Sequence, residues 1–222
     1  MFNEEMNDTI RNYIVNSKYK GNSGRWVFAN KVLYDLCADY IKHDDEHIIV
    51  TKIWLIGRSY AAAIERRKKT EEEIIEDFYY DKVAPAILKI GDKLDSNITE
   101  VNKMGSDLND DQVITILKTH YDLTKVFNEI TGMDKRSLAS KYLHFHCPNH
   151  FFIYDSRAAS NIGKFATKDK DLYNNIYNNN INTMDQTYCD FYLKALQISR
   201  QAKKISDHTL SPRDIDNIIY YI

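Results

Sequence analysis

Long stretches of this chain place apolar residues at helical spacing, and few helix-breaking residues interrupt them. Only 7 glycines and 3 prolines occur among 222 residues. Folds rich in β-strands need many tight turns, which glycine and proline supply, so their scarcity favours long helices. We therefore predict an all-α protein of about ten helices. They form one compact body or two helical lobes with a cleft between them.

Apolar periodicity and helix start signals indicate where the helices lie. The expected helices are 4–16, 25–43, 46–69, 70–93, a short one from Asn97 to Gly105, 109–130, 135–146, 184–204, and a last one that begins at Ser211. The polar segment 163–182 is expected to be a loop with a weak helix. The chain is one helical domain, 1–222, whose lobes, if there are two, cover about 1–105 and 106–222.

Three of these helices carry more specific signals. Helix 46–69 is apolar nearly all round its first four turns, which predicts the central buried helix. Thr70 and Glu73 fit a capping box at the start of helix 70–93. Pro85 should kink or restart that helix, because proline lacks the backbone N–H that a helix interior needs.

Composition and charge exclude several classes of protein. The net charge of −2 is unlike that of a strongly basic nucleic-acid binder, although it leaves local basic patches open. The three cysteines are odd in number and far apart, so no disulfide framework is expected. The longest apolar stretch, 48–64, is broken by Lys52 and Arg58, so no membrane span is expected. The acidic N-terminus lacks a signal-peptide pattern. We expect a cytoplasmic protein without a cofactor.

The most specific pattern lies in residues 130–159. A turn at Gly132 precedes helix 135–146, and an apolar run from Phe151 to Tyr154 then ends at Asp155. A carboxylate at the end of an apolar run and beside a helix start is held in place and partly desolvated. Asp155 is therefore either a helix cap or an acid with a chemical role.

This stretch resembles the helix-hairpin-helix (HhH-GPD) DNA glycosylase superfamily, and most of all its 8-oxoguanine glycosylase branch. Ile130-Thr131-Gly132-Met133 stands for the start of the family's hairpin, and Leu138-Ala139 stands for its end. Ile153-Tyr154-Asp155-Ser156-Arg157-Ala158 stands for its acid motif. The likeness covers about 30 residues. Asp134 replaces the second glycine of the hairpin.

The resemblance implies a role for several residues. Asp155 would be the essential carboxylate, and Ser137 stands where a lysine nucleophile occurs in part of the family. A shifted turn would bring Lys135 to that place. Backbone N–H groups at Gly132 would hold a DNA phosphate at a helix N-terminus. The cations expected to add charge there are Lys135, Arg136, Lys141 and Arg157.

Two further groups of residues have alternative interpretations. Trp54, Arg58 and Tyr60 either line a base pocket, or Arg58 forms a structural ion pair with Glu65. The histidines between 144 and 150 and Cys147 do not follow a standard zinc spacing, so no metal is expected.

Two functions follow from these observations. The first is a DNA N-glycosylase, a hydrolase that cleaves the glycosidic bond of a flipped base with Asp155. The second is a helical module of the same kind without catalysis, which binds nucleic acid or a protein partner. Base release from damaged or modified DNA distinguishes the two.

Overall fold

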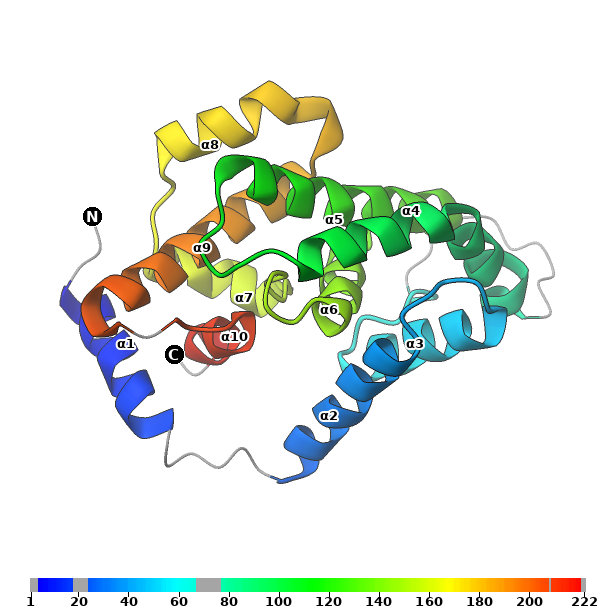
Figure 1. Cartoon of the computed structure of the whole chain (residues 1–222), viewed down its shortest axis with the longest axis horizontal. Helices are drawn as coiled ribbons and strands as arrows, with labels where there is room; N and C mark the ends of the chain where they lie inside the picture. Colours follow the sequence, from blue (N-terminus) through cyan, green and yellow to red (C-terminus); the bar gives the residue numbers. More distant parts are fainter. Residues whose placement is uncertain (1–3, 18–23, 67–76, 208, 221–222) are drawn as a thin grey trace.

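A computed structural model describes residues 4–17, 24–66, 77–207 and 209–220 of the chain (Figure 1). It is 76% helical, with ten α-helices and no strand among the described residues, which confirms the all-α prediction. The helices are α1 Glu4–Ser17, α2 Gly24–Asp39, α3 Glu46–Ser59, α4 Ala84–Asn102, α5 Asp110–Thr131, α6 Arg136–His146, α7 Ser156–Asn161, α8 Lys170–Ile176, α9 Gln186–Ser206 and α10 Pro212–Tyr220.

Side chains cap the starts of most of these helices, as the sequence indicates. Asn109 and Gln112 form a reciprocal capping box at α5. Single aspartates accept backbone N–H bonds at the starts of α3, α7, α8 and α9. Pro212 is the first residue of α10. The predicted capping box of Thr70 and Glu73 lies outside the described residues.

Helix α3 ends at Ser59, so the prediction of one helix over 46–69 is wrong at its C-terminal end. Ala61 has the left-handed φ of 52°, and the N–H of Ala62 returns to the carbonyl of Gly57 at 2.7 Å. The turn places Ala63 close to Gly57 and buries Ile64. The stability gained by burying these two apolar residues therefore exceeds the stability that a continued helix would give, although their spacing in the sequence fits a helix.

Helix α4 runs unbroken to Asn102, so the separate helix predicted from Asn97 to Gly105 does not exist. The apolar stripe that begins at Ile87 continues through Leu94, Ile98 and Val101, all of which are buried. Pro85 lies in the first turn of α4, after a π-helical turn at Tyr79–Val83, so the proline restarts the helix as predicted.

Helix α6 is the centre of the fold, because residues 138–146 are all buried. It packs against α2, α3 and α5. The predicted central helix, α3, is less enclosed, and Trp54 on it is exposed. Figure 1 shows α4 and α5 side by side, and α1 near α9 and α10. The two-lobe alternative stays a prediction. No helix in the described part of the chain is both long and apolar enough to cross a membrane.

Candidate functional site

Asp155 lies where the chain returns along α6 and begins α7. Residues 151–153 are buried, and the Oγ of Ser140 accepts a bond from the N–H of Tyr154 at 3.0 Å, which fixes this return. Oδ1 of Asp155 accepts the N–H of Ala158 at 2.8 Å, so Asp155 is the N-cap of α7. Its side chain is 32% exposed. One oxygen caps the helix, and the other is left for another partner.

That partner is Lys141, from the middle of α6. Its Nζ lies 3.9 Å from Oδ2 of Asp155, and its side chain is only 3% exposed. The ammonium donates to Oγ of Ser137 at 2.9 Å and to the carbonyl of Tyr60 at 3.4 Å. Burial lowers the pKa of Lys141, although Asp155 and Asp216 act in the opposite direction. A desolvated lysine of this kind is the form in which an amine serves as a nucleophile.

Helix α10 brings a second carboxylate and an arginine to the same place. Burial and, to a smaller extent, the charge of Asp155 raise the pKa of Asp216 to about 6, against the effect of Arg213 and Lys141. Nη1 of Arg213 lies 3.2 Å from Oδ2 of Asp216. The site therefore contains Lys141 and Arg213 with two carboxylates, drawn from α6, α7 and α10.

Arg213 also joins α10 to three other elements. Its Nη2 donates to the hydroxyl of Tyr60 at 2.9 Å and to that of Tyr34 at 3.3 Å, and it lies 3.4 Å from Nε2 of His144. The Tyr34 hydroxyl and Nε2 of His144 are 2.7 Å apart. Burial lowers the pKa of His144 to about 3, so its ring is neutral. Nε of Arg213 is buried and has no hydrogen-bond partner among the residues that the structure describes.

Aromatic rings line this group of charges. The Tyr60 ring lies 5.4 Å from Phe145, 6.4 Å from Trp26 and 6.0 Å from Nζ of Lys141. Tyr34 contacts Phe145 at 4.8 Å. Trp26 is about half-exposed, so a series of aromatic side chains leads from the surface toward the buried lysine.

Of the residues predicted for the hairpin and its phosphate contacts, Ser137 and Lys141 lie together in the site. The others make the following contacts. Gly132 ends α5 with a φ of 65°. The guanidinium of Arg136 binds Asp185 at 2.7 Å and Asp134 at 3.1 Å, so two carboxylates already occupy it. The ammonium of Lys135 donates to the carbonyl of Arg66. The Arg157 guanidinium stacks on the ring of Tyr220, 3.9 Å from its centroid.

Of the three residues predicted to line a pocket, Trp54 and Arg58 lie on α3 and Tyr60 follows it. Arg58 pairs with Glu65, the alternative arrangement given for it, and its guanidinium lies 6.0 Å from the ring of Trp54. Tyr79 donates to the same glutamate. Tyr60 instead belongs to the site, through its ring and through Arg213. Trp54 is about half-exposed.

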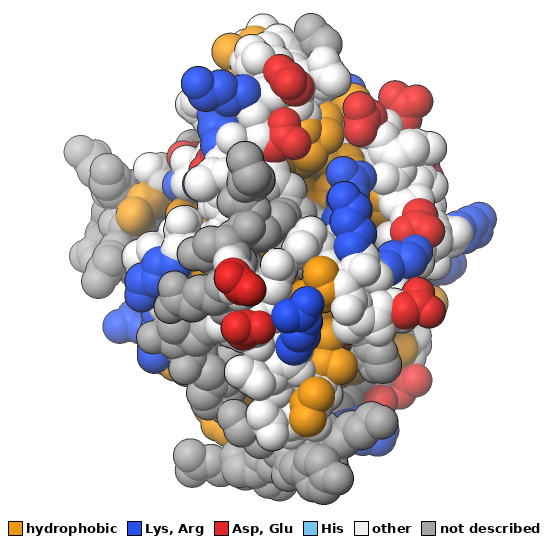
Figure 2. Space-filling model, turned by 90° about the vertical axis from the view of Figure 1, so that its left-hand side faces the viewer, with side chains coloured by type: hydrophobic (Ala, Val, Ile, Leu, Met, Phe, Trp, Pro, Cys, Tyr) orange, Lys and Arg blue, Asp and Glu red, His pale blue; other side chains and the backbone are white. Residues whose placement is uncertain are grey.

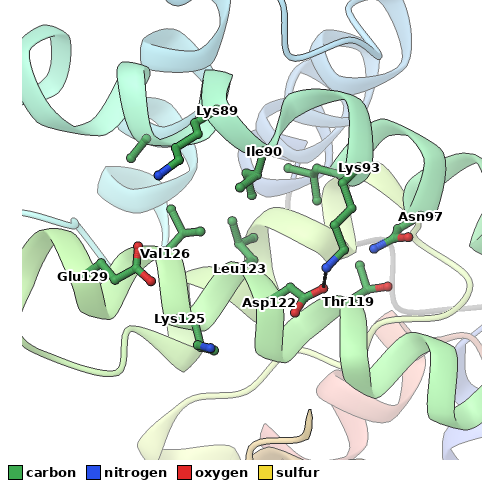
Figure 3. A pocket seen from close by; sticks show the side chains of 12 residues that line it. Lys89, Ile90, Lys93, Asn97, Thr119, Asp122, Leu123, Lys125, Val126 and Glu129 are labelled. Atoms are coloured by element: carbon green, nitrogen blue, oxygen red, sulfur yellow. Dashed lines mark ion pairs between the residues drawn. The ribbon is translucent and has the colours of Figure 1, made fainter.

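A separate surface pocket lies between α4 and α5 (Figure 3). Its volume is about 370 Å³, and it is lined by the apolar side chains of Ile90 and Leu123 and by lysines and acids. Lys93 and Asp122 form an ion pair of 2.6 Å across it. None of the residues predicted from the sequence as functional lines this pocket.

The structure contains two further features that bear on ligands. Within the described ranges, no group of three or more His, Cys, Asp or Glu side chains is placed to hold a metal ion. On the face shown in Figure 2, the described Lys and Arg side chains are interspersed with Asp and Glu. The described side chains on this face therefore do not form the basic stripe typical of a nucleic-acid-binding surface.

Sequence reasoning did not identify Arg213, Asp216, Tyr34 or His144 as members of one site. The Ser-Pro-Arg-Asp start marks α10 as a helix, but nothing in its pattern shows which residues lie against α6. Comparisons with protein families, curated proteins and solved structures find no match to this chain.

Proposed function

We propose that the protein cleaves the N-glycosidic bond between a base of DNA and its sugar, with Lys141 and Asp155 as the reacting groups. The observation that carries this proposal is the position of the buried Lys141 amine, 3.9 Å from Oδ2 of Asp155 and 2.9 Å from Oγ of Ser137. The proposal places the nucleophile at Lys141, one helical turn after Ser137.

The chemistry of the bond requires both groups. Cleavage builds positive charge on the anomeric carbon of the sugar, which a fixed carboxylate stabilises. A neutral amine forms a covalent bond to the same carbon as the base leaves, and ring opening gives an imine that water hydrolyses. The lowered pKa of Lys141 increases the neutral fraction of its amine. Asp155 is more exposed than Lys141 and so lies on the solvent side of the pair.

A base stacked in a duplex cannot reach a lysine that is 3% exposed. The base must first leave the stack and enter an enclosed site, where aromatic side chains hold its faces. The Tyr60 ring lies 6.0 Å from the amine of the lysine, and the rings of Phe145 and Trp26 lie next to Tyr60. These contacts support a flipped base as the substrate.

Borohydride trapping tests the proposal, because it reduces a lysine–sugar imine to a stable amine. The protein is incubated with oligonucleotides that carry damaged, mismatched or modified bases, and covalent complexes are separated on a denaturing gel. We expect the wild type to be trapped, and Lys141→Gln not to be trapped. Lys135→Gln is the matched control and should be trapped like the wild type. Equal trapping of Lys141→Gln, or no base release by the wild type, contradicts the proposal.

One observation favours the alternative of a helical module without catalysis. The near-complete enclosure of Lys141 means that helices around it must part before a base enters. A salt-dependent gel shift with oligonucleotides, without base release or trapping, would support this second function.

A further inference from the structure

The reaction proposed above also needs a proton for the leaving base. A base that departs with the electron pair of the glycosidic bond is a poor leaving group unless its nitrogen is protonated as the bond breaks. General acid catalysis of this kind is typically worth about 10²–10⁴ in rate. The donor must lie beside the reacting pair and must still carry its proton near neutral pH.

Two of the groups beside Lys141 are unsuited to this task. Asp155 accepts the N–H of Ala158 with one oxygen and faces Lys141 with the other. His144 is neutral, and its Nδ1 is bonded to the carbonyl of Phe151 at 2.9 Å. Both are therefore occupied by other contacts.

We infer that Asp216, from the C-terminal helix α10, is the general acid that protonates the leaving base. This inference rests on the proposed function. The side chain of Asp216 is 16% exposed, and it is held by Nη1 of Arg213 at 3.2 Å. Arg213 is itself fixed by the hydroxyls of Tyr60 and Tyr34, so it is the positioning residue for the acid.

The charged groups that act on Asp216 come from three elements. They are Arg213 on its own helix, Lys141 on α6, and Asp155 at the start of α7. Burial and, to a smaller extent, the charge of Asp216 in turn raise the pKa of Tyr60, which follows α3. Burial, together with the charge of Asp155, outweighs the two cations and raises the pKa of the carboxyl to about 6. The group is therefore partly protonated near neutral pH.

The proton balance of the step closes within the site. The lone pair of the Lys141 amine forms the bond from Nζ to the anomeric carbon. The bond from that carbon to the base nitrogen breaks, its electron pair goes to the base, and the base takes the proton of Asp216. The new secondary ammonium of Lys141 then returns a proton to the Asp216 carboxylate. No other reactant is consumed in this step.

The pH dependence of single-turnover base release tests this assignment. For the wild type we expect the rate to rise with pH up to about 6 and then to level off, because above that pH the loss of the Asp216 proton offsets the deprotonation of Lys141. Asp216→Asn should lower the rate at pH 6 about 100-fold, and its rate should continue to rise above pH 6 as Lys141 loses its proton. Asp214→Asn is the matched control on α10. It removes the carboxylate that accepts from Ser211 and Tyr13, but its rate should still level off near pH 6.

Two outcomes separate this inference from the proposed function. If the wild type releases base, and the rate of Asp216→Asn equals that of the wild type and also levels off near pH 6, the assignment of Asp216 is overturned while the proposed function stands. If Lys141→Gln and Asp155→Asn release base like the wild type, the proposed function fails and this assignment fails with it.

A titration of the side-chain carboxyl carbons by NMR provides a test that needs no activity. We expect the Asp216 carboxyl to titrate near 6 in the wild type. Titration near 4, the ordinary range for aspartate, overturns the inference whatever the rates show. Thermal unfolding of Asp216→Asn establishes that the variant is folded.

Discussion

The Nζ atom of Lys141 lies 3.9 Å from Oδ2 of Asp155, although the two residues belong to different helices. Asp155 therefore has two partners, one for each oxygen: the N–H of Ala158 and the Lys141 ammonium. The first partner requires only a hydrogen-bond acceptor, whereas the second requires a negative charge. Substitutions at this one position can separate the two roles.

Asp155→Asn should keep the cap and lose the charge. Because asparagine caps helices about as well as aspartate, any loss of stability in Asp155→Asn comes from the buried Lys141 ammonium, which is left without its carboxylate. Asp155→Ala should lower the free energy of unfolding by about 1 kcal/mol more than Asp155→Asn, because the N–H of Ala158 also loses its acceptor. Urea unfolding measures both.

Both substitutions should abolish base release, since neither side chain carries a charge. Base release by Asp155→Asn at the wild-type rate would remove the chemical role of the carboxylate. A loss of stability in Asp155→Asn equal to that in Asp155→Ala would contradict the assignment of the cap.

The pair of Arg136 and Asp185 should matter for stability, because it joins α6 to the start of α9. Asp185 is 7% exposed in its side chain, caps Tyr188 at 2.7 Å, and binds Arg136 through both oxygens. Arg136→Met should lower the free energy of unfolding by about 2 kcal/mol, because a buried carboxylate is left without its cation.

The control for this pair is Arg58→Gln, which breaks a pair whose arginine is more than half exposed. It should change the free energy of unfolding by less than about 1 kcal/mol. Denaturant unfolding of the two variants under the same conditions compares them. Similar losses in both would show that the Arg136 pair is no stronger than a surface pair.

Gly91 in α4 should not tolerate a side chain, although alanine is the better helix former. A Cβ at this position would lie 2.6 Å from the carbonyl oxygen of His43, which is a backbone atom and cannot move aside. The clash should lower the free energy of unfolding of Gly91→Ala by about 1–3 kcal/mol, more than the roughly 1 kcal/mol that helix propensity restores.

Gly163→Ala is the control, because no atom of the described residues lies within 4 Å of a Cβ built there. Its thermal midpoint should equal or slightly exceed that of the wild type. A Gly91→Ala variant as stable as Gly163→Ala would mean that the backbone of His43 does not lie against α4 as described.

The buried ring of His120 should make the fold less stable in weak acid. It stacks on Tyr188 with centroids 3.5 Å apart, and burial lowers its pKa to about 4. The unfolded chain therefore binds a proton near pH 6.5 that the folded protein binds only near 4. The contribution of His120 to stability is complete above pH 6.5 and falls as the pH decreases through this window, by about 2 kcal/mol between pH 7 and pH 5.

Urea unfolding at pH 7 and pH 5 measures this effect. His120→Gln should lose stability at pH 7 and show a smaller difference between the two pH values. His47→Gln, which replaces an exposed histidine, should keep the wild-type difference. An unchanged pH dependence in His120→Gln would show that this ring is not the group that titrates.

The helices of this protein follow largely from local sequence. Residues that start helices, such as Asn109 and Pro212, act through their own backbone neighbours, and apolar periodicity such as that of α5 needs no partner to be recognised. The same is true of Asp155, whose place after an apolar run marks it as a cap. These features depend on residues a few positions apart, so they can be predicted from the order of residues alone.

The end of α3, the length of α4 and the members of the site were decided only by tertiary packing. Ala61 turns the chain because Ile64 is buried against other helices, and no local signal shows that burial. Arg213 reaches Tyr60 and His144 because α10 packs near α6, and the sequence does not specify which helices become neighbours. The pKa of Asp216 depends on desolvation by those neighbours, so its value exists only in the folded chain.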